Sequence, residues 1–360
     1  MSGHNSAAVA NLPTPDPPRA YAPVVEEVAR RARLIGLALT ALRAGPALIL
    51  LLLIMVIASQ TDIFLTVNNL GNVLAQTAVI ATLALGQLLV ILTRGIDLSV
   101  GSILALSTVT GALIFESITA GPVVILVMLV TGALIGLVNG LVFVKAKLPH
   151  PFITTLAMLS IARGAALVLT DGQPKQGMPD LVRTIGGGSV GAFPYSAFVV
   201  AGATLLTMLL LYRLTWGRWV YAVGGDPEAA RRVGIPVDRV LISVYVLSGL
   251  AAGIAAVLTA GRTNAGSPTF GTLAELDAIS AVIIGGVSFL GGRGMVSNAL
   301  VGALMVGVLR NGLNLLNVDA FYQMIAIGVI LVLAVWLDTV RGRFESRFRA
   351  LQTTAQGATK

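Results

Sequence analysis

The sequence contains no cysteine, only two histidines and few charged residues. The absence of cysteine excludes disulfide bonds, thiol chemistry and metal sites with cysteine ligands. The histidines, His4 and His150, are too far apart in the chain to indicate a metal site. Charged residues make up 11% of the 360 residues, against about 25% in a soluble domain, whereas hydrophobic residues make up 56%. This composition predicts a membrane protein without a resident metal ion.

The two ends of the chain differ from its middle. Residues 1–23 are rich in proline, serine and asparagine and have no apolar run near their start, so we expect a disordered cytoplasmic tail and not a cleaved signal peptide. Residues 24–43 have apolar residues at helical spacing and arginines on the opposite side, which is typical of an amphipathic helix lying on the membrane surface. Residues 341–360 are basic and are expected to form a second cytoplasmic tail.

Apolar segments fill the chain between residues 45 and 340. A membrane-spanning helix needs about 20 apolar residues, and most of the segments approach that length. The first and eighth are short, and the eighth contains Gly285 and Gly286, so it could either cross the membrane or form a re-entrant hairpin. The segments are 45–59, 72–93, 98–116, 122–144, 152–170, 194–212, 240–260, 277–290, 295–315 and 321–338. They predict an all-α, polytopic transmembrane helical bundle with about ten transmembrane helices, in a transmembrane domain of residues 45–340.

The charges of the loops decide between the two readings of the eighth segment. Lysine and arginine concentrate on the cytoplasmic side of membrane proteins. With ten crossings and the N-terminus inside, the outside loops hold only Lys175, Arg183 and Arg262. A re-entrant eighth segment would instead place the basic C-terminus outside. We therefore predict ten crossings with both termini in the cytoplasm.

A charged segment, GDPEAARRVGI, interrupts the apolar chain in a predicted cytoplasmic loop. Asp226 is a favourable N-cap, Pro227 suits the first helical turn, and Gly234 is well placed to end a helix. These signals predict a helix of about two turns. The segment is either an ordinary solvated loop or a docking helix whose two small alanines let a partner approach closely.

The segment EAARRVG resembles the EAA signature of ABC-importer permeases, the cytoplasmic helix that couples to the ATPase. The longer GGDPEAARRVGI is similar to the form found in sugar permeases of the ribose, xylose and arabinose type. Further matching stretches between about residues 60 and 340 are TRGIDLSVGSILAL, GLVNGLVFVKAKLPHPFITTLAMLSIARGAALVLTDGQP, ELDAISAVIIGGVSFLGGRG and LRNGLNLLNVDAFYQMIAIGVILVLAVWLD. The chain departs from the pattern at His150, where a second proline is common, at Asp226, where asparagine is common, and before Glu275, where Gly-Tyr is usual.

The resemblance implies the membrane-spanning permease subunit of an ATP-driven importer for a monosaccharide or a related polyol. It implies a multi-pass protein of the bacterial inner membrane, surrounded by lipid, that forms a homodimer with an ABC ATPase and a periplasmic sugar-binding protein as partners. ATP and Mg²⁺ would belong to the ATPase, so no catalytic residue, cofactor or metal site is expected in this chain, and no nucleic acid as a partner. The ATPase-coupling residues that it implies are Asp226, Pro227, Glu228, Ala229, Ala230 and Gly234.

Charged residues within or beside the apolar segments are candidates for the solute pathway. Asp97 stands at a predicted membrane boundary and either caps the third helix or contacts solute, and we expect the cap. Arg163 either extends to the outer surface or lines the pathway. Glu275 and Asp277 precede the eighth segment, as either an exposed cap pair or part of an outer mouth that meets a binding protein.

Four side-chain amides, Asn139, Asn311, Asn314 and Gln323, lie in predicted helices. Such groups bond across helices in many membrane proteins, but an uncharged polyol also needs hydrogen-bond partners. Asn311 and Asn314 are one helical turn apart, and we prefer them as pathway residues.

Three other functions are disfavoured. The glycine-rich GGVSFLGGRG lacks the GK[ST] ending of a phosphate-binding loop, so it predicts a tight intracellular turn and the energy source must be another chain. An ion-coupled secondary transporter of small polar solutes is the alternative, but it should have acidic residues in the middle of the membrane, and few acids in this sequence qualify. A membrane-embedded enzyme would need converging catalytic groups, and none is evident.

Overall fold

The computed structural model describes residues 45–357, with side chains through residue 340 except that of residue 337. The predicted tail 1–23 and amphipathic helix 24–43 lie outside the described residues. Residues Ala44–Thr339 form one compact unit, and the following paragraphs concern that unit.

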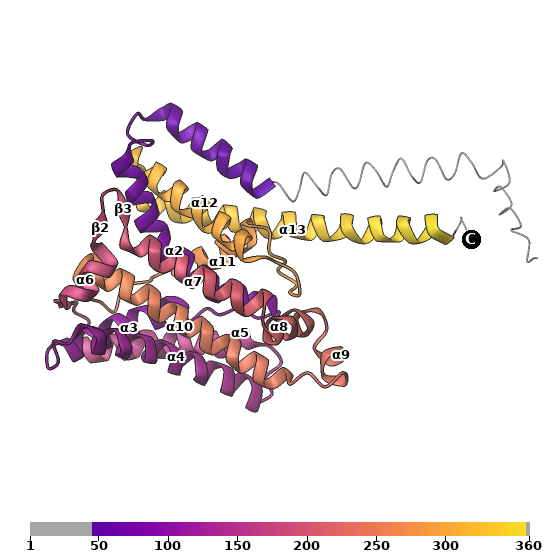
Figure 1. The fold of residues 1–360 in the computed structure, drawn as a ribbon, viewed down its shortest axis with the longest axis horizontal. Coiled ribbons are helices and arrows are strands. Elements are labelled where there is room, and N and C mark those ends of the chain that lie inside the picture. Colours follow the sequence, from indigo (N-terminus) through magenta and orange to yellow (C-terminus); the bar gives the residue numbers. More distant parts are fainter. Residues whose placement is uncertain (1–44, 358–360) are drawn as a thin grey trace, which may run out of the picture. The chain divides into compact units, whose positions relative to one another are not determined.

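The described residues are almost entirely helical (Figure 1). The sheet structure of the described residues consists of two pairs of very short antiparallel strands. Strand β1 (Lys175–Gln176) pairs with β4 (Ala265–Gly266), and β2 (Ser189–Val190) pairs with β3 (Phe193–Pro194). The helices are Gly45–Gln60, α2 (Val67–Leu92), α3 (Val100–Phe115), α4 (Gly121–Lys145), α5 (Pro151–Thr170), α6 (Asp180–Gly187), α7 (Tyr195–Tyr212), α8 (Thr215–Gly225), α9 (Pro227–Arg232), α10 (Val237–Thr263), α11 (Ala274–Ile284), α12 (Val296–Leu315) and α13 (Ala320–Gly357).

Seven of the described helices are long and apolar enough to cross a membrane, and they confirm the prediction of an all-α, polytopic membrane protein. They are α2, α4, α5, α7, α10, α12 and the first part of α13, Ala320–Val340. The helix Gly45–Gln60 and α3 are apolar but shorter.

The eighth predicted segment is neither a full-length helix nor a hairpin. The chain leaves α10 and runs back along α3, where a Cβ on Gly266 would lie 2.3 Å from the Thr108 carbonyl oxygen and one on Gly271 would lie 2.5 Å from that of Gly101. Helix α11 then begins inside the bundle and has 11 residues, a length of about 16 Å against a membrane core of about 30 Å. Residues 264–273 and α11 together therefore take the chain from one end of the bundle to the other.

The core consists of two apolar clusters. The first joins α2, α7, α8, α10, α11 and α12, and it includes Ala230 of α9. The second joins α3, α4, α6, α11 and a later part of α10. Glycines bring α4 and α10 into backbone contact, because a Cβ on Gly136 would lie 2.2 Å from the Tyr245 carbonyl oxygen and one on Gly249 would lie 2.1 Å from that of Gly132.

The short helices mark the two ends of the bundle (Figure 1). Helices α8 and α9 lie at one end, and α6 with the β2–β3 hairpin lies at the other. The loops rich in arginine and lysine belong to the α8–α9 end, which the positive-inside rule assigns to the cytoplasm. The α6 end is therefore the outer end.

Candidate coupling site and polar sites within the bundle

The charged segment forms the predicted short helix, α9. The Asp226 carboxylate accepts hydrogen bonds from the backbone N–H groups of Glu228 (2.9 Å) and Ala229 (3.0 Å), and Pro227 occupies the first turn. These bonds, above all that from Ala229, hold the pKa of the Asp226 carboxyl below its usual value. Gly234 follows the helix with φ +83°, a conformation that favours glycine. The predicted N-cap, first turn and terminating glycine are confirmed.

The two alanines of α9 lie on different sides of the helix. Ala230 is buried in the apolar core of the bundle, whereas Glu228 and Ala229 are exposed. The idea that both alanines face a partner is therefore wrong for Ala230, which anchors α9 to its own chain. The surface open to a partner includes Glu228, Ala229 and Val233.

The loop after α2 holds the start of α9 in place. Arg94 donates from Nε to the Gly224 carbonyl oxygen (2.7 Å) and from a terminal nitrogen to that of Gly225. A Cβ on Gly224 would lie 1.7 Å from the Leu92 carbonyl oxygen, so only glycine allows this approach. These contacts bridge residues 130 and 131 positions apart in the sequence, so no local motif indicates them.

The glycine-rich turn between α11 and α12 joins the same cluster and confirms the predicted tight turn. The Gly292 N–H donates to the Leu92 carbonyl oxygen (2.9 Å), and the Tyr221 hydroxyl donates to that of Gly294 (2.9 Å). Together with Arg94, these contacts join α8 and α9 to the cytoplasmic ends of α2, α11 and α12. We call this cluster, formed by Leu92–Arg94, Tyr221–Gly225 and Gly291–Gly294, the cytoplasmic junction.

Asp97 lies inside the bundle and not at a membrane boundary. Its carboxylate accepts hydrogen bonds from the Ser99 N–H (3.0 Å), the Ser99 hydroxyl (2.6 Å) and the Ser248 hydroxyl near the middle of α10 (2.8 Å). Ser99 also accepts from the Asn139 side chain on α4 (2.8 Å). The bond from the Ser99 N–H is the kind that the predicted cap would make, although the N-cap position of α3 itself is Ser99, which makes no side-chain cap bond. Asp97 also links the start of α3 to α4 and α10, and its side chain is fully buried. Contact of Asp97 with solute stays a prediction.

Arg163 fixes the irregular chain that precedes α11. Its guanidinium donates to the carbonyl oxygens of Pro268 and Phe270, the second at 2.8 Å. Of the two alternatives for Arg163, extension to the outer surface is therefore wrong, because both groups that it binds are backbone carbonyls. A place along the pathway stays a prediction. In a membrane interior these carbonyls need such a donor, because no water is available to replace it.

Glu275 and Asp277 are buried at the start of α11, only 8% and 3% exposed, so the alternative of an exposed cap pair is wrong. A place in an outer mouth that meets a binding protein stays a prediction. Asp277 forms an ion pair with Arg310 of α12 (2.6 Å). Glu275 lies against Gly101, where a Cβ would be 2.3 Å from Oε2, and this oxygen has no hydrogen-bond partner among the described residues. Sequence analysis missed this position because it depends on how residues 264–273 fold back along α3.

The remaining amides bond across helices. Asn311 on α12 and Asn69 on α2 exchange two hydrogen bonds (2.9 and 3.0 Å), and Gln323 on α13 donates to Asn314 on α12 (2.7 Å). These bonds agree with the alternative that such amides bond across helices instead of contacting solute. Contact of Asn139, Asn311, Asn314 or Gln323 with solute stays a prediction.

Replacing Asn311 by alanine tests which role applies. Asn69 would keep its bond to the Phe64 carbonyl oxygen but lose the reciprocal pair, so we expect the free energy of unfolding to fall by about 1 kcal/mol and uptake per folded molecule to stay normal. Thermal unfolding and solute uptake measure the two effects, with Gln173→Ala, which removes an exposed side-chain amide outside the helices, as the control. A loss of uptake at unchanged stability would identify Asn311 as a pathway residue.

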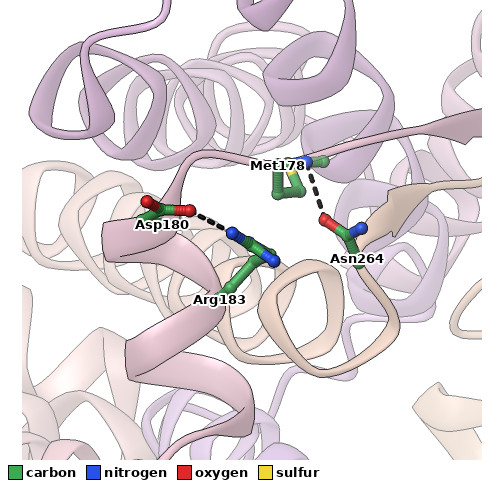
Figure 2. A network of polar contacts seen from close by, with 4 residues as sticks. All are labelled: Met178, Asp180, Arg183 and Asn264. Atoms are coloured by element: carbon green, nitrogen blue, oxygen red, sulfur yellow. Dashed lines mark hydrogen bonds and ion pairs between the residues drawn. The ribbon is translucent and has the colours of Figure 1, made fainter.

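The outer end of the bundle is organised around the end of α10 (Figure 2). The Asn264 side chain accepts a hydrogen bond from the Met178 N–H (2.9 Å), and Arg183 pairs with Asp180 within α6. Nearby, a polar cavity of about 320 Å³ opens between α2, α6 and the end of α10, within the usual size range of small-molecule sites. Its lining includes Asn68, Asn72, Gly186–Ser189, Gly191 and Arg262. No residue of this cavity was predicted, since its lining is largely backbone.

Comparisons with known proteins agree with this architecture. A family model described as "Branched-chain amino acid transport system / permease component" matches residues 69–335. The ribose import permease protein RbsC of Escherichia coli (strain K12) is 41% identical over 293 residues, which cover 80% of this chain and 91% of that protein. RbsC of Bacillus subtilis (strain 168) is 40% identical over 301 residues, 82% of this chain and 92% of that protein.

A relative with another named sugar is the D-allose transport system permease protein AlsC of Escherichia coli (strain K12), 35% identical over 297 residues, 82% of this chain and 90% of that protein. No solved structure matches the chain. The matched region includes α3, the junction and α9 to α12, and extends into α13. The chain therefore belongs to this family of transport-system permease components.

Proposed function

We propose that the chain is the membrane-spanning permease subunit of an ATP-driven importer for a monosaccharide or a related polyol, in the bacterial inner membrane. The relatives named above are permeases for ribose and allose, and a fructose import permease of Rhizobium meliloti is 38% identical over 286 residues. A permease of this type works with a separate ATPase and a substrate-binding protein. The chain forms the pathway, performs no chemistry and acts as one half of a homodimer, while ATP and Mg²⁺ bind to the ATPase.

The observation that carries this proposal is the attachment of α9 to the cytoplasmic junction. An ATPase that binds the exposed residues of α9 and closes on ATP displaces that helix. The bonds of Arg94 with Gly224 and Gly225 then pass the displacement to α2, and Gly292 passes it to the turn between α11 and α12. The bundle thereby shifts between two packings, one open inward and one open outward.

The structure corrects one argument against the alternative of an ion-coupled carrier. Sequence analysis expected few acidic residues inside the membrane, but Asp97, Glu275 and Asp277 are all buried within the bundle. Two of these three carboxylates have polar partners within the chain: Asp97 accepts hydrogen bonds from hydroxyl groups, and Asp277 forms an ion pair with Arg310. The relatives named above are import or transport-system permeases, and they support the ATP-driven reading.

Reconstitution separates the two functions. We expect vesicles that contain the permease, its ATPase and the binding protein to accumulate radiolabelled ribose only when ATP is supplied, with no effect of a proton ionophore. Empty vesicles and vesicles with an ATPase unable to hydrolyse ATP are the controls. Uptake by the permease alone, driven by an ion gradient, would refute the proposal.

Replacing Gly234 by tryptophan is expected to abolish uptake while the protein remains inserted. The positive φ of Gly234 disfavours any side chain by about 1–2 kcal/mol, and the indole would stand beside the exposed side of α9. Uptake assays and membrane fractionation measure the result. The matched control is Gly202→Trp in α7, where the glycine also has open space around it but no positive φ. Normal uptake by Gly234→Trp would count against the role of α9.

A further inference from the structure

A second cavity lies near the cytoplasmic end, on the side of α10 that faces α7 and α8. It has a volume of about 540 Å³ and an almost wholly apolar lining. The lining residues are Leu210, Leu214, Trp216, Arg239, Ile242, Ser243, Val246 and Leu247. We call this feature the α7–α10 groove.

The groove extends over part of the depth of the cytoplasmic leaflet. Arg239 lies in the first turn of α10, next to the cytoplasmic loops, and Val246 lies about 10 Å further along the helix. Half of the membrane core is about 15 Å thick. The apolar part of the groove is therefore level with the acyl chains of the cytoplasmic leaflet, and Arg239 is level with the lipid headgroups.

The charge at the cytoplasmic rim is unbalanced. Arg239 is exposed and has no ion pair among the described residues, because the neighbouring Asp238 pairs with Arg231 (2.9 Å). No acidic residue lines the groove. Two further exposed arginines, Arg213 and Arg218, flank Leu214 and Trp216 in the sequence, and their charges add to the positive potential at the rim.

The side chain of Trp216 lines the cytoplasmic rim of the groove and is held in place by a hydrogen bond. Its indole N–H donates to the Ser243 hydroxyl on α10 (2.8 Å), which holds the ring across the space between α8 and α10. Tryptophan is enriched at membrane interfaces, where its ring meets headgroups and its edge forms hydrogen bonds. The groove thus combines an apolar floor, an interfacial tryptophan and an unpaired guanidinium.

We propose that an anionic phospholipid of the cytoplasmic leaflet occupies the α7–α10 groove, with its phosphate on Arg239 and its acyl chains against Leu210, Ile242 and Val246. An apolar helix of a partner would fill the floor but leave the guanidinium unpaired, whereas a phospholipid satisfies both parts. Basic pockets between membrane helices on the cytoplasmic side bind anionic headgroups for this reason. Because α8 and α10 flank α9 in the sequence, the bound lipid also stabilises the positions of the two helices that are joined to α9.

Native mass spectrometry of the detergent-purified protein tests the proposal. With equal amounts of dioleoyl phosphatidylglycerol and dioleoyl phosphatidylcholine added, we expect at least a tenfold preference for the anionic lipid. Arg239→Glu should abolish the preference, and Arg239→Lys should keep part of it. The matched control is Lys145→Glu, a charge reversal at another exposed basic residue at the cytoplasmic end, which should keep it in full.

A variant without a charge change tests the apolar part. Val246→Trp fills the groove and is expected to remove the bound anionic lipid while Arg239 is intact. An equal loss in Lys145→Glu and Arg239→Glu, or full lipid binding in Val246→Trp, would show attraction to surface charge in general and overturn the proposal. A disulfide between two copies of a Val246→Cys variant would also overturn the proposal, since it would show that a second copy of the chain occupies the groove. The native chain has no cysteine, so such a disulfide could form only at the introduced residue.

Discussion

Replacing Arg94 by alanine is expected to lower ATP-driven uptake at least about tenfold, with normal insertion into the membrane. The substitution removes the donors of two carbonyl groups, those of Gly224 and Gly225, at the point where α8 meets α9. Hydrogen bonds to charged groups contribute about 1.5–3 kcal/mol each, and a coupling loss of about 1.4 kcal/mol already corresponds to a tenfold change. Uptake by reconstituted vesicles measures the effect, and co-purification shows whether the ATPase still binds.

Lys147→Ala is the matched control for this prediction. Lys147 is also exposed, cytoplasmic and basic, and it has a positive φ of 51° beside 64° for Arg94, so both substitutions leave the same kind of backbone strain. Only Arg94 reaches the start of α9. Full uptake in Arg94→Ala, or an equal loss in Lys147→Ala, would show that the junction does not transmit the motion of α9.

Replacing Arg163 by methionine is expected to destabilise the protein by about 1.5–3 kcal/mol, the usual contribution of a hydrogen bond to a charged group. The carbonyl groups of Pro268 and Phe270 would lose their donor inside the membrane, and Glu275 would lose the favourable charge of Arg163. We expect thermal unfolding in detergent, followed by tryptophan fluorescence, to begin well below the wild-type temperature. Uptake should be lost in parallel.

Two further variants make this prediction specific. Arg183→Met breaks the ion pair with Asp180 at the surface and should change stability by less than about 1 kcal/mol. Adding Glu275→Gln to Arg163→Met removes the unpaired buried charge and should recover part of the lost stability. An unchanged unfolding temperature in Arg163→Met would mean that the chain before α11 holds its place without this arginine.

The long helices and the cap of α9 could be predicted because their signals are local. A run of apolar residues specifies a membrane helix wherever it packs, and Asp226 with Pro227 specifies a helix start within three residues. The family resemblance also depends on short contiguous stretches, above all EAARRVG. Each of these features is visible without knowing which parts of the chain become neighbours.

The polar contacts could not be predicted in the same way, because they join distant parts of the chain. Arg163 binds carbonyls 105 and 107 residues away, and Ser248 binds Asp97 across 151 residues. The depth of Asp97 was misjudged because the third helix begins at Val100, well inside the bundle, instead of at a membrane surface. Average hydropathy gives no sign that a helix starts in mid-bundle or that irregular chain enters it.

The close backbone contact between α4 and α10 has a mechanical consequence. Helix α10 has 27 residues and is about 40 Å long, and at Gly132, Gly136 and Gly249 its backbone and that of α4 are in direct contact. We therefore expect the two helices to move as one rigid body, with α9 near the cytoplasmic end and the polar cavity near the outer end. Rotation of this rigid body about its middle moves its two ends in opposite directions. A displacement of α9 at the cytoplasmic end would then close one entrance while it opens the other.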